Sequence, residues 1–143
     1  MLAGILAKGK TVLENAAMEP EIKHLADFLN LCGAKIKGAG TSTIEITGGK
    51  LLSAGKKVYE TIPDRIETGS FLILGALAGK NLEITNCIPE HIQSLIELLK
   101  HSGISMDISK NKICVKDNKK TTLKSLDVPT HEYPGFSTDL QAP

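Results

Sequence analysis

The sequence repeats itself at an interval of about 70 residues, and this repeat constrains the fold more than any other feature. Four apolar residues at helical spacing and the glycine that follows them recur 70 positions later, Ile22, Leu25, Phe28, Leu29 and Gly33 becoming Ile92, Leu95, Leu98, Leu99 and Gly103. Ile44 and Ile46, in an alternating segment typical of a strand, recur 69 positions later as Ile113 and Val115. The sequence therefore predicts two copies of one small unit of helices and strands.

Turn residues and apolar periodicity place the elements around this repeat. Helices are predicted at residues 2–8, 20–32, 65–78 and 89–102, each followed by a glycine, namely Gly9, Gly33, Gly79 and Gly103. Strands are predicted at residues 11–16, 34–37, 43–47, 57–62, 82–86, 105–108, 112–115 and 123–128. Because strands that alternate with amphipathic helices give sheets covered by helices, we expect the α/β (α+β) class with small mixed sheets.

The composition argues against several classes of partner. The 17 basic and 16 acidic residues leave a net charge of +1, so no basic field points to nucleic acid or to an anionic membrane. Aromatic residues make up 3% of the chain, too few for a platform that stacks single-stranded nucleic acid. No apolar run is long enough to span a bilayer, and the first residues lack the basic region of a signal peptide. We therefore expect a cytoplasmic protein without nucleic-acid or membrane partners.

The cysteines and histidines show no pattern of metal or nucleophile chemistry. Cys32, Cys87 and Cys114 form no CxxC pair and occupy apolar-pattern positions, which predicts reduced thiols in the core. None of the 4 histidines pairs with a cysteine or a carboxylate at the spacing of a ligand set or a triad. The glycines at 38–40 and 48–49 are too few for a phosphate cradle. The sequence thus predicts no metal and no cofactor.

The C-terminal stretch PGFSTDLQAP combines a turn, an aromatic ring, two hydroxyls and a carboxylate. Pro134 and Gly135 break any preceding element. Ser137 or Thr138 then caps a short helix beginning at Asp139, which places the carboxylate near a helix N-terminus. Asp139 is either a simple cap or a carboxylate that a rigid turn holds ready to accept a proton from a substrate hydroxyl.

This stretch resembles the active-site aspartate segment of the UDP-N-acetylglucosamine 1-carboxyvinyltransferases, the enolpyruvyl transferases that open bacterial peptidoglycan synthesis. Residues 14–22 (ENAAMEPEI) and 63–72 (PDRIETGSFL) resemble the same family in the same order. The similarity runs along the whole chain, which has roughly a third of the length of such an enzyme. We interpret the chain as an internal fragment that is inactive alone, since the family's N-terminal Lys-Asn pair, catalytic cysteine loop and later arginines lie outside it.

The resemblance also implies an architecture and a reaction. The family is built from repeated βαβαββ units in two domains, so residues 1–48 would end one domain, 49–62 would cross the hinge, and 63–143 would begin the other domain and carry the active-site turn. In the reaction, the 3′-hydroxyl of UDP-N-acetylglucosamine adds to C2 of phosphoenolpyruvate, and phosphate then leaves. These two substrates are the partners that the resemblance implies.

Matching positions carry the roles of the sugar site over to this sequence. Asp139 corresponds to the family aspartate at the attacking hydroxyl, and Thr138 and Phe136 would line the same site. The resemblance implies that Asp139 orients the hydroxyl and accepts its proton, which typically accelerates a reaction about 10²- to 10⁴-fold.

Two further pairs of residues have two interpretations each. Asp64 and Arg65 are either a charge pair that faces the cleft between domains and helps to set closure, or a helix-start aspartate beside a solvated arginine. Glu19 and Glu21 match acidic family positions near the cleft, but they are equally explained as first-turn carboxylates that the helix dipole favours.

Two alternative functions remain open at this point. The 3-phosphoshikimate 1-carboxyvinyltransferases share the repeat fold, although the matches at residues 65–72 and 136–141 favour the sugar-nucleotide enzymes. A non-catalytic repeat scaffold would instead bind a partner through exposed strand edges.

Overall fold

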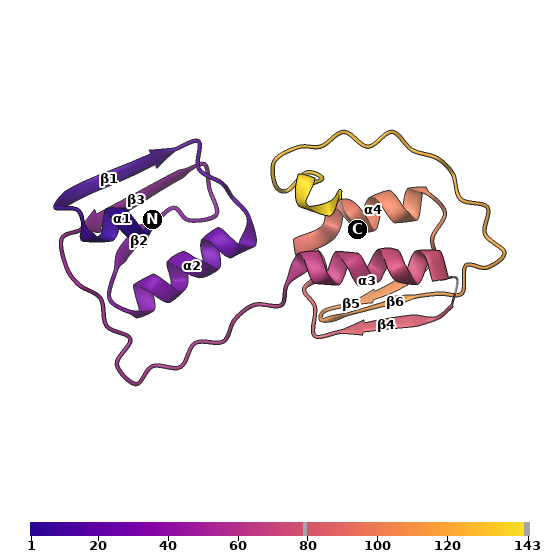
Figure 1. Ribbon diagram of the computed structural model, residues 1–143, viewed down its shortest axis with the longest axis horizontal. Coiled ribbons are helices and arrows are strands. Elements are labelled where there is room, and N and C mark those ends of the chain that lie inside the picture. The colour runs from indigo at the N-terminus through magenta and orange to yellow at the C-terminus, as the bar shows by residue number, and fades with distance from the viewer. Residues whose placement is uncertain (79, 142–143) are drawn as a thin grey trace. The chain divides into compact units, whose positions relative to one another are not determined.

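A computed structural model describes residues 1–78 and 80–141 of the chain. The chain forms two compact units, Met1–Ile62 and a second unit that starts at Pro63. In each unit, helices pack against one small sheet (Figure 1). Within the described residues, no helix is both long and apolar enough to cross a membrane.

The first unit contains two helices and a three-stranded sheet. Its elements are α1 (Leu2–Leu6), β1 (Gly9–Glu14), α2 (Pro20–Leu31), β2 (Lys35–Lys37) and β3 (Thr43–Gly48). The strand order is β1-β3-β2, and both pairs are antiparallel. Pro20 begins α2 at the first position, where its missing N–H costs no hydrogen bond. The buried core joins both helices to the sheet and comprises Ile5, Ala26, Leu29, Ile36, Ile44 and Ile46.

The second unit repeats this plan and adds a long C-terminal loop. Its elements are α3 (Arg65–Ala78), β4 (Leu82–Thr85), the 3-10 helix η1 (Pro89–Ile92), α4 (Gln93–His101), β5 (Met106–Ser109), β6 (Lys112–Val115) and, after the loop, the 3-10 helix η2 (Thr138–Leu140). The strand order β4-β6-β5 is again antiparallel throughout. Apolar residues of α3, α4, η2 and β6 share one core, so the end of the loop belongs to the packed unit.

The two sheets share one register, which confirms the repeat predicted from the sequence. Leu13 pairs with Ile44 in the first unit, and Ile84 pairs with Ile113 in the second. Ile44 and Ile113 are both fully buried beneath the helices. The equivalence holds although few residues are identical, because it depends on which positions face the core.

The turn after the first strand is also the same in both units. Asn15 and Asn86 both have positive φ, 51° and 55°, a left-handed conformation that asparagine tolerates better than most residues. In each unit the next residue donates its backbone N–H to a carbonyl of the loop before the last strand. Ala16 donates to the Ser42 carbonyl over 2.9 Å, and Cys87 donates to the Asn111 carbonyl over 3.2 Å.

Helices α2 and α4 end in the same way. Gly33 and Gly103 follow α2 and α4 with φ of 104°, and the residue after each glycine donates its N–H to a carbonyl five positions earlier. This is the Schellman arrangement, which satisfies carbonyls that the helix end leaves open and favours glycine because of the positive φ. The predicted ends at these two glycines are correct.

Two predicted strands are absent from the structure. Residues 57–62, which alternate in polarity, and residues 123–128 were both predicted as strands, but neither segment is a strand. Alternation fits any extended segment with one covered face, and a strand also needs a partner backbone. Residues 57–62 instead lie alongside α2, and residues 123–128 lie exposed.

Three smaller expectations also need correction. The sheets are antiparallel rather than mixed, because β1 and β2 flank β3 on opposite sides and each runs against it. The first helix ends at Leu6, since Ala7 is already extended with ψ of 140°, and Gly9 begins β1 instead of capping the helix. Helix α4 is preceded by a 3-10 turn from Pro89. The predicted stop at Gly79 lies outside the described residues.

Candidate active-site turn

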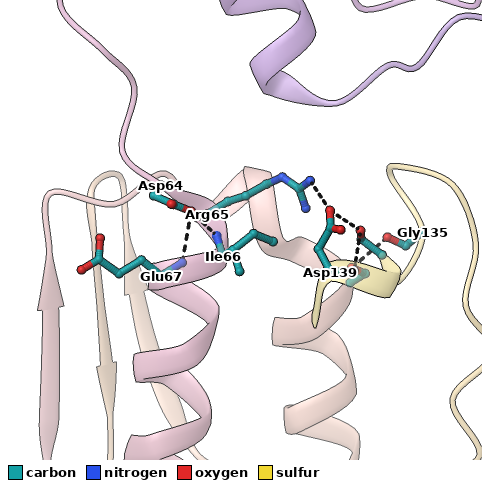
Figure 2. Close-up of polar contacts among 8 residues, drawn as sticks. Asp64, Arg65, Ile66, Glu67, Gly135 and Asp139 are labelled. Atoms are coloured by element: carbon teal, nitrogen blue, oxygen red, sulfur yellow. Dashed lines mark hydrogen bonds and ion pairs between the residues drawn. The ribbon is translucent and has the colours of Figure 1, made fainter. Parts of the chain in front are cut away.

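The turn that carries Asp139 is built from hydrogen bonds on both sides of a cis Tyr133–Pro134 peptide. The Gly135 N–H donates to the Glu132 carbonyl over 2.8 Å, and the His131 N–H donates to the Phe136 carbonyl over 3.0 Å. Ser94 of α4 donates its hydroxyl to the Gly135 carbonyl over 3.2 Å. The turn is therefore closed on itself and also bound to a helix of the core (Figure 2).

Two apolar side chains anchor the turn in the core of the second unit. Leu140 is only 4% exposed, and Phe136 packs half-buried against the same core. Gly69 of α3 makes room for this anchor, because a Cβ added there would lie 2.8 Å from Leu140 Cδ2 and 3.2 Å from Leu95 Cδ2. The apolar residues beside Asp139 thus fix its backbone.

Ser137 caps the short helix η2 and also contacts the carboxylate. The Asp139 N–H donates to Ser137 Oγ over 3.3 Å, and the Ser137 hydroxyl donates to Asp139 Oδ2 over 3.0 Å. Of the two candidate caps in the sequence, Ser137 takes this role and is buried, whereas Thr138 is exposed. The Asp139 side chain remains 61% exposed.

Arg65 supplies the positive charge behind this carboxylate. Its Nη2 lies 3.5 Å from Asp139 Oδ2 (Figure 2). Its Cζ lies 5.9 Å from the centre of the Tyr133 ring. The Arg65 side chain is only 5% exposed, which contradicts the alternative of a solvated arginine. A buried guanidinium needs anionic or polar partners, so the arrangement holds the Asp139 carboxylate from its protein side and leaves the other side open to solvent.

Asp64 acts as the cap of α3. Its Oδ1 accepts hydrogen bonds from the backbone N–H groups of Ile66, over 2.7 Å, and Glu67, over 3.1 Å. The Thr68 hydroxyl donates to the Asp64 carbonyl over 2.7 Å. These contacts satisfy N–H groups that a helix start leaves open, and they fix the backbone from which Arg65 projects.

Glu19 and Glu21 belong to the first unit and lie at the start of α2. Glu19 immediately precedes α2 but makes no side-chain capping bond, and its Oε2 is buried without a hydrogen-bond partner. Glu21 is exposed in the first turn of α2, where the helix dipole favours a carboxylate.

The thiols are placed as core residues rather than as reactive groups. Cys32 and Cys87 are buried and Cys114 is half-buried, and all three are free thiols. Burial raises the pKa of the Cys87 thiol, which keeps it protonated. Across residues 1–78 and 80–141, no three side chains of histidine, cysteine, aspartate or glutamate gather closely enough to hold a metal ion.

Sequence reasoning missed two features of the structure. The contact between Arg65 and Asp139 spans 74 positions, and no local pattern connects the two residues. His24, which the sequence pattern did not single out, forms three hydrogen bonds with the segment at residues 59–62. Its position within the apolar face of α2 gives no signal of these partners.

The repeated units have the fold of the enolpyruvyl transferases. The family model of EPSP synthase (3-phosphoshikimate 1-carboxyvinyltransferase) matches residues 1–143, and the chain belongs to this family. Its fold is similar to that of the enolpyruvyl transferase NikO from Streptomyces tendae, with a TM-score of 0.71, 25% identity, and coverage of 98% of this chain and 33% of that one.

The curated relatives are more specific. The chain is 49% identical over 142 residues to UDP-N-acetylglucosamine 1-carboxyvinyltransferase of Solibacter usitatus, covering 99% of this chain and 33% of that protein. It is 50% identical over 143 residues to UDP-N-acetylglucosamine 1-carboxyvinyltransferase 2 of Bacillus subtilis, covering 100% of this chain and 33% of that protein. The chain therefore spans about a third of the length of these relatives. The enolpyruvyl transferase resemblance seen in the sequence is confirmed.

Proposed function

We propose that this chain forms one wall of the sugar site in an enzyme that transfers enolpyruvyl from phosphoenolpyruvate to the 3′-hydroxyl of UDP-N-acetylglucosamine in peptidoglycan synthesis. The support is that relatives named UDP-N-acetylglucosamine 1-carboxyvinyltransferase match the chain over 99% to 100% of its length. We further propose that the reaction takes place in the cytoplasm.

Asp139 is the residue to which we assign the proton-accepting role. The observation that carries this assignment is that its carboxylate is 61% exposed while Oδ2 is held from the protein side by Arg65 and Ser137. Both contacts described for the carboxylate fall on Oδ2, so we assign Oδ1 to the substrate hydroxyl. As the hydroxyl oxygen bonds to C2 of phosphoenolpyruvate, its proton passes to Oδ1, while the C2=C3 π bond opens and C3 takes a proton from a general acid of the enzyme. Loss of a proton from C3 then re-forms the double bond as phosphate leaves.

The neighbouring residues have supporting roles in this proposal. Thr138 is exposed next to Asp139 and is the hydroxyl that we expect to touch the sugar. Phe136 mainly anchors the turn, and only the exposed part of its ring is available to a ligand. Arg65 is a positioning residue, because it acts on the substrate through Asp139.

The division into domains is part of the same proposal. Residues 1–48 end one domain, 49–62 cross to the next, and 63–143 begin the other. Glu19, Glu21 and Asp64 then belong to the segments on either side of this crossing. Asp64 serves chiefly as a helix cap, because its carboxylate is already engaged by two N–H groups.

A chimera tests the proposed function. Residues 1–143 replace the matching third of the Bacillus subtilis relative, with which they align over their whole length. We expect the purified chimera to release phosphate from phosphoenolpyruvate when UDP-N-acetylglucosamine is present, and not when shikimate 3-phosphate replaces it. A folded chimera that is inactive with UDP-N-acetylglucosamine, while the unaltered relative turns over beside it, would contradict the proposal. The chain alone is expected to release no phosphate.

A further inference from the structure

The segment that follows β3 is attached to the first unit at successive points. Leu52 packs partly buried against the core, and the Ser53 N–H donates to the Cys32 carbonyl over 3.3 Å. The Lys57 ammonium donates to the Leu31 carbonyl at the end of α2. The segment at residues 49–62 therefore runs along the unit instead of leaving it as a free tether.

The last attachment is made by His24 of α2 through both of its ring nitrogens. The Ile62 N–H donates to Nε2 over 3.3 Å, and the Tyr59 hydroxyl oxygen lies 3.0 Å from Nδ1. The Tyr59 hydroxyl also donates to the His24 carbonyl over 2.9 Å. The two rings are in contact, with centroids 4.6 Å apart.

These hydrogen bonds are compatible with only one protonation state of the imidazole. A backbone N–H can only donate, so Nε2 must accept from Ile62. A neutral ring then carries its proton on Nδ1, which donates to the Tyr59 oxygen, and the Tyr59 hydroxyl is free to donate to the His24 carbonyl. Protonation of Nε2 would place two donors against each other and break the contact with Ile62.

We propose that His24 is a pH-sensitive latch that fastens residues 59–62 to α2 while its ring is neutral and releases them on acidification. Histidine is the side chain that ordinarily changes charge between about pH 5 and pH 8. With the latch closed, Ile62 is fixed to the first unit by its bond to His24, and Asp64 is fixed to the second unit as the cap of α3. The joint between the two units is then confined to residues 62–64.

The charged groups around His24 do not replace the lost contact. On α2, Lys23 and Asp27 pair with each other over 2.7 Å, one turn apart. Desolvation raises the pKa of Tyr59, and the nearby Asp27 adds to this, so its hydroxyl stays protonated throughout the range in question. On the segment itself, Lys57 is bound to the Leu31 carbonyl and Glu60 is exposed. The hold on the Ile62 N–H therefore depends on an accepting Nε2 of His24.

Amide exchange of the chain of residues 1–143, measured by NMR, tests the latch. We expect the protection factor of the Ile62 N–H, corrected for intrinsic exchange, to fall by roughly threefold to tenfold between about pH 8 and about pH 5. The His24→Phe variant keeps an aromatic ring but cannot accept the bond, so its Ile62 amide should be as weakly protected at both pH values as the parent is in acid. The His101→Gln variant, altered at a histidine of the second unit, should behave like the parent.

A second readout does not depend on any variant. The ¹⁵N spectrum of the imidazole should show the proton on Nδ1 above neutral pH. A proton on Nε2 in that range would overturn the proposal, as would equal Ile62 protection at both pH values in the parent. Protection in a folded His24→Phe variant that matches the parent at about pH 8 would also overturn it.

Discussion

Arg65 Nη2 lies 3.5 Å from Asp139 Oδ2, so the only arginine of the sequence meets the carboxylate of the C-terminal turn across 74 positions. The two partners differ sharply in exposure, 5% for the arginine side chain and 61% for the aspartate. The carboxylate can reach a ligand in solvent while its orientation is set from inside the unit. A helix cap alone would not require a buried cation behind it.

Asp139→Asn should reduce catalysis strongly in the chimera. The amide keeps the shape of the carboxylate but removes its charge and proton affinity, so we expect kcat to fall by about 10² or more. Steady-state kinetics with UDP-N-acetylglucosamine measure the effect. Near-normal kcat in this variant would leave Asp139 as a structural residue only.

The same substitution should also lower the stability of the chain. The buried Arg65 guanidinium loses its contact with the Asp139 carboxylate, which we expect to cost about 1–2 kcal/mol, more than the loss of a cap alone would suggest for asparagine. Thermal or denaturant unfolding measures the change. Asp107→Asn is the matched control, since its carboxylate pairs with Lys116 on the surface and its loss should be hardly detectable.

Asp64→Ala should lower stability by about 1 kcal/mol, because the Ile66 and Glu67 N–H groups lose their acceptor. Asp64→Asn should retain most of the stability, since asparagine is also a good cap. Unfolding of the two variants side by side gives the comparison. If kcat of the chimera drops by about tenfold or more in the asparagine variant, Asp64 has a role in the reaction beyond capping.

Asn15→Ala and Asn86→Ala should each cost about 1 kcal/mol, because alanine is strained at the positive φ that both residues adopt. The glycine variants at the same two positions should stay close to the parent, since glycine adopts this conformation without strain. Separate melts of the four variants would show whether the units respond alike. A large difference between the alanine variants would argue against structural equivalence of the two turns.

In the native chain the half-buried Cys114 thiol should react first with alkylating reagents, and the buried thiols of Cys32 and Cys87 should both react slowly. Because burial raises the pKa of Cys87, the unfolded thiol ionises at a lower pH than the folded one. Its contribution to stability is therefore complete below the unfolded pKa and is lost as the pH rises through the folded pKa. Mass spectrometry of labelled chain over an alkaline series checks both the order and the sign.

The sequence predicts well what local chemistry determines. The bounds of α3 and β6 coincide with the predicted segments. For α3 the cap and the stop are encoded next to the helix, and for both elements the periodic apolar face is encoded within the segment itself. The predictions of strands at residues 57–62 and 123–128 were wrong, because the sequence of an extended segment does not reveal whether a partner backbone is present. Asp139 and Arg65 were both candidate residues, but the contact between them could not be predicted, because a contact between residues so distant in sequence has no local signature.

Leu140 and Phe136 flank Asp139, and both hold the turn to the core, whereas residues 121–132 upstream of them are exposed. The position of the carboxylate is thus determined by residues that follow the long exposed loop. Changes in the length or composition of the exposed residues 125–130 should therefore leave the carboxylate in place. A substitution in the core at Leu95 or Gly69, which lie against each other and beside Leu140, would move it. Substitutions or insertions at residues 125–130 should therefore be tolerated where changes to the side chains packed around Leu140 are not.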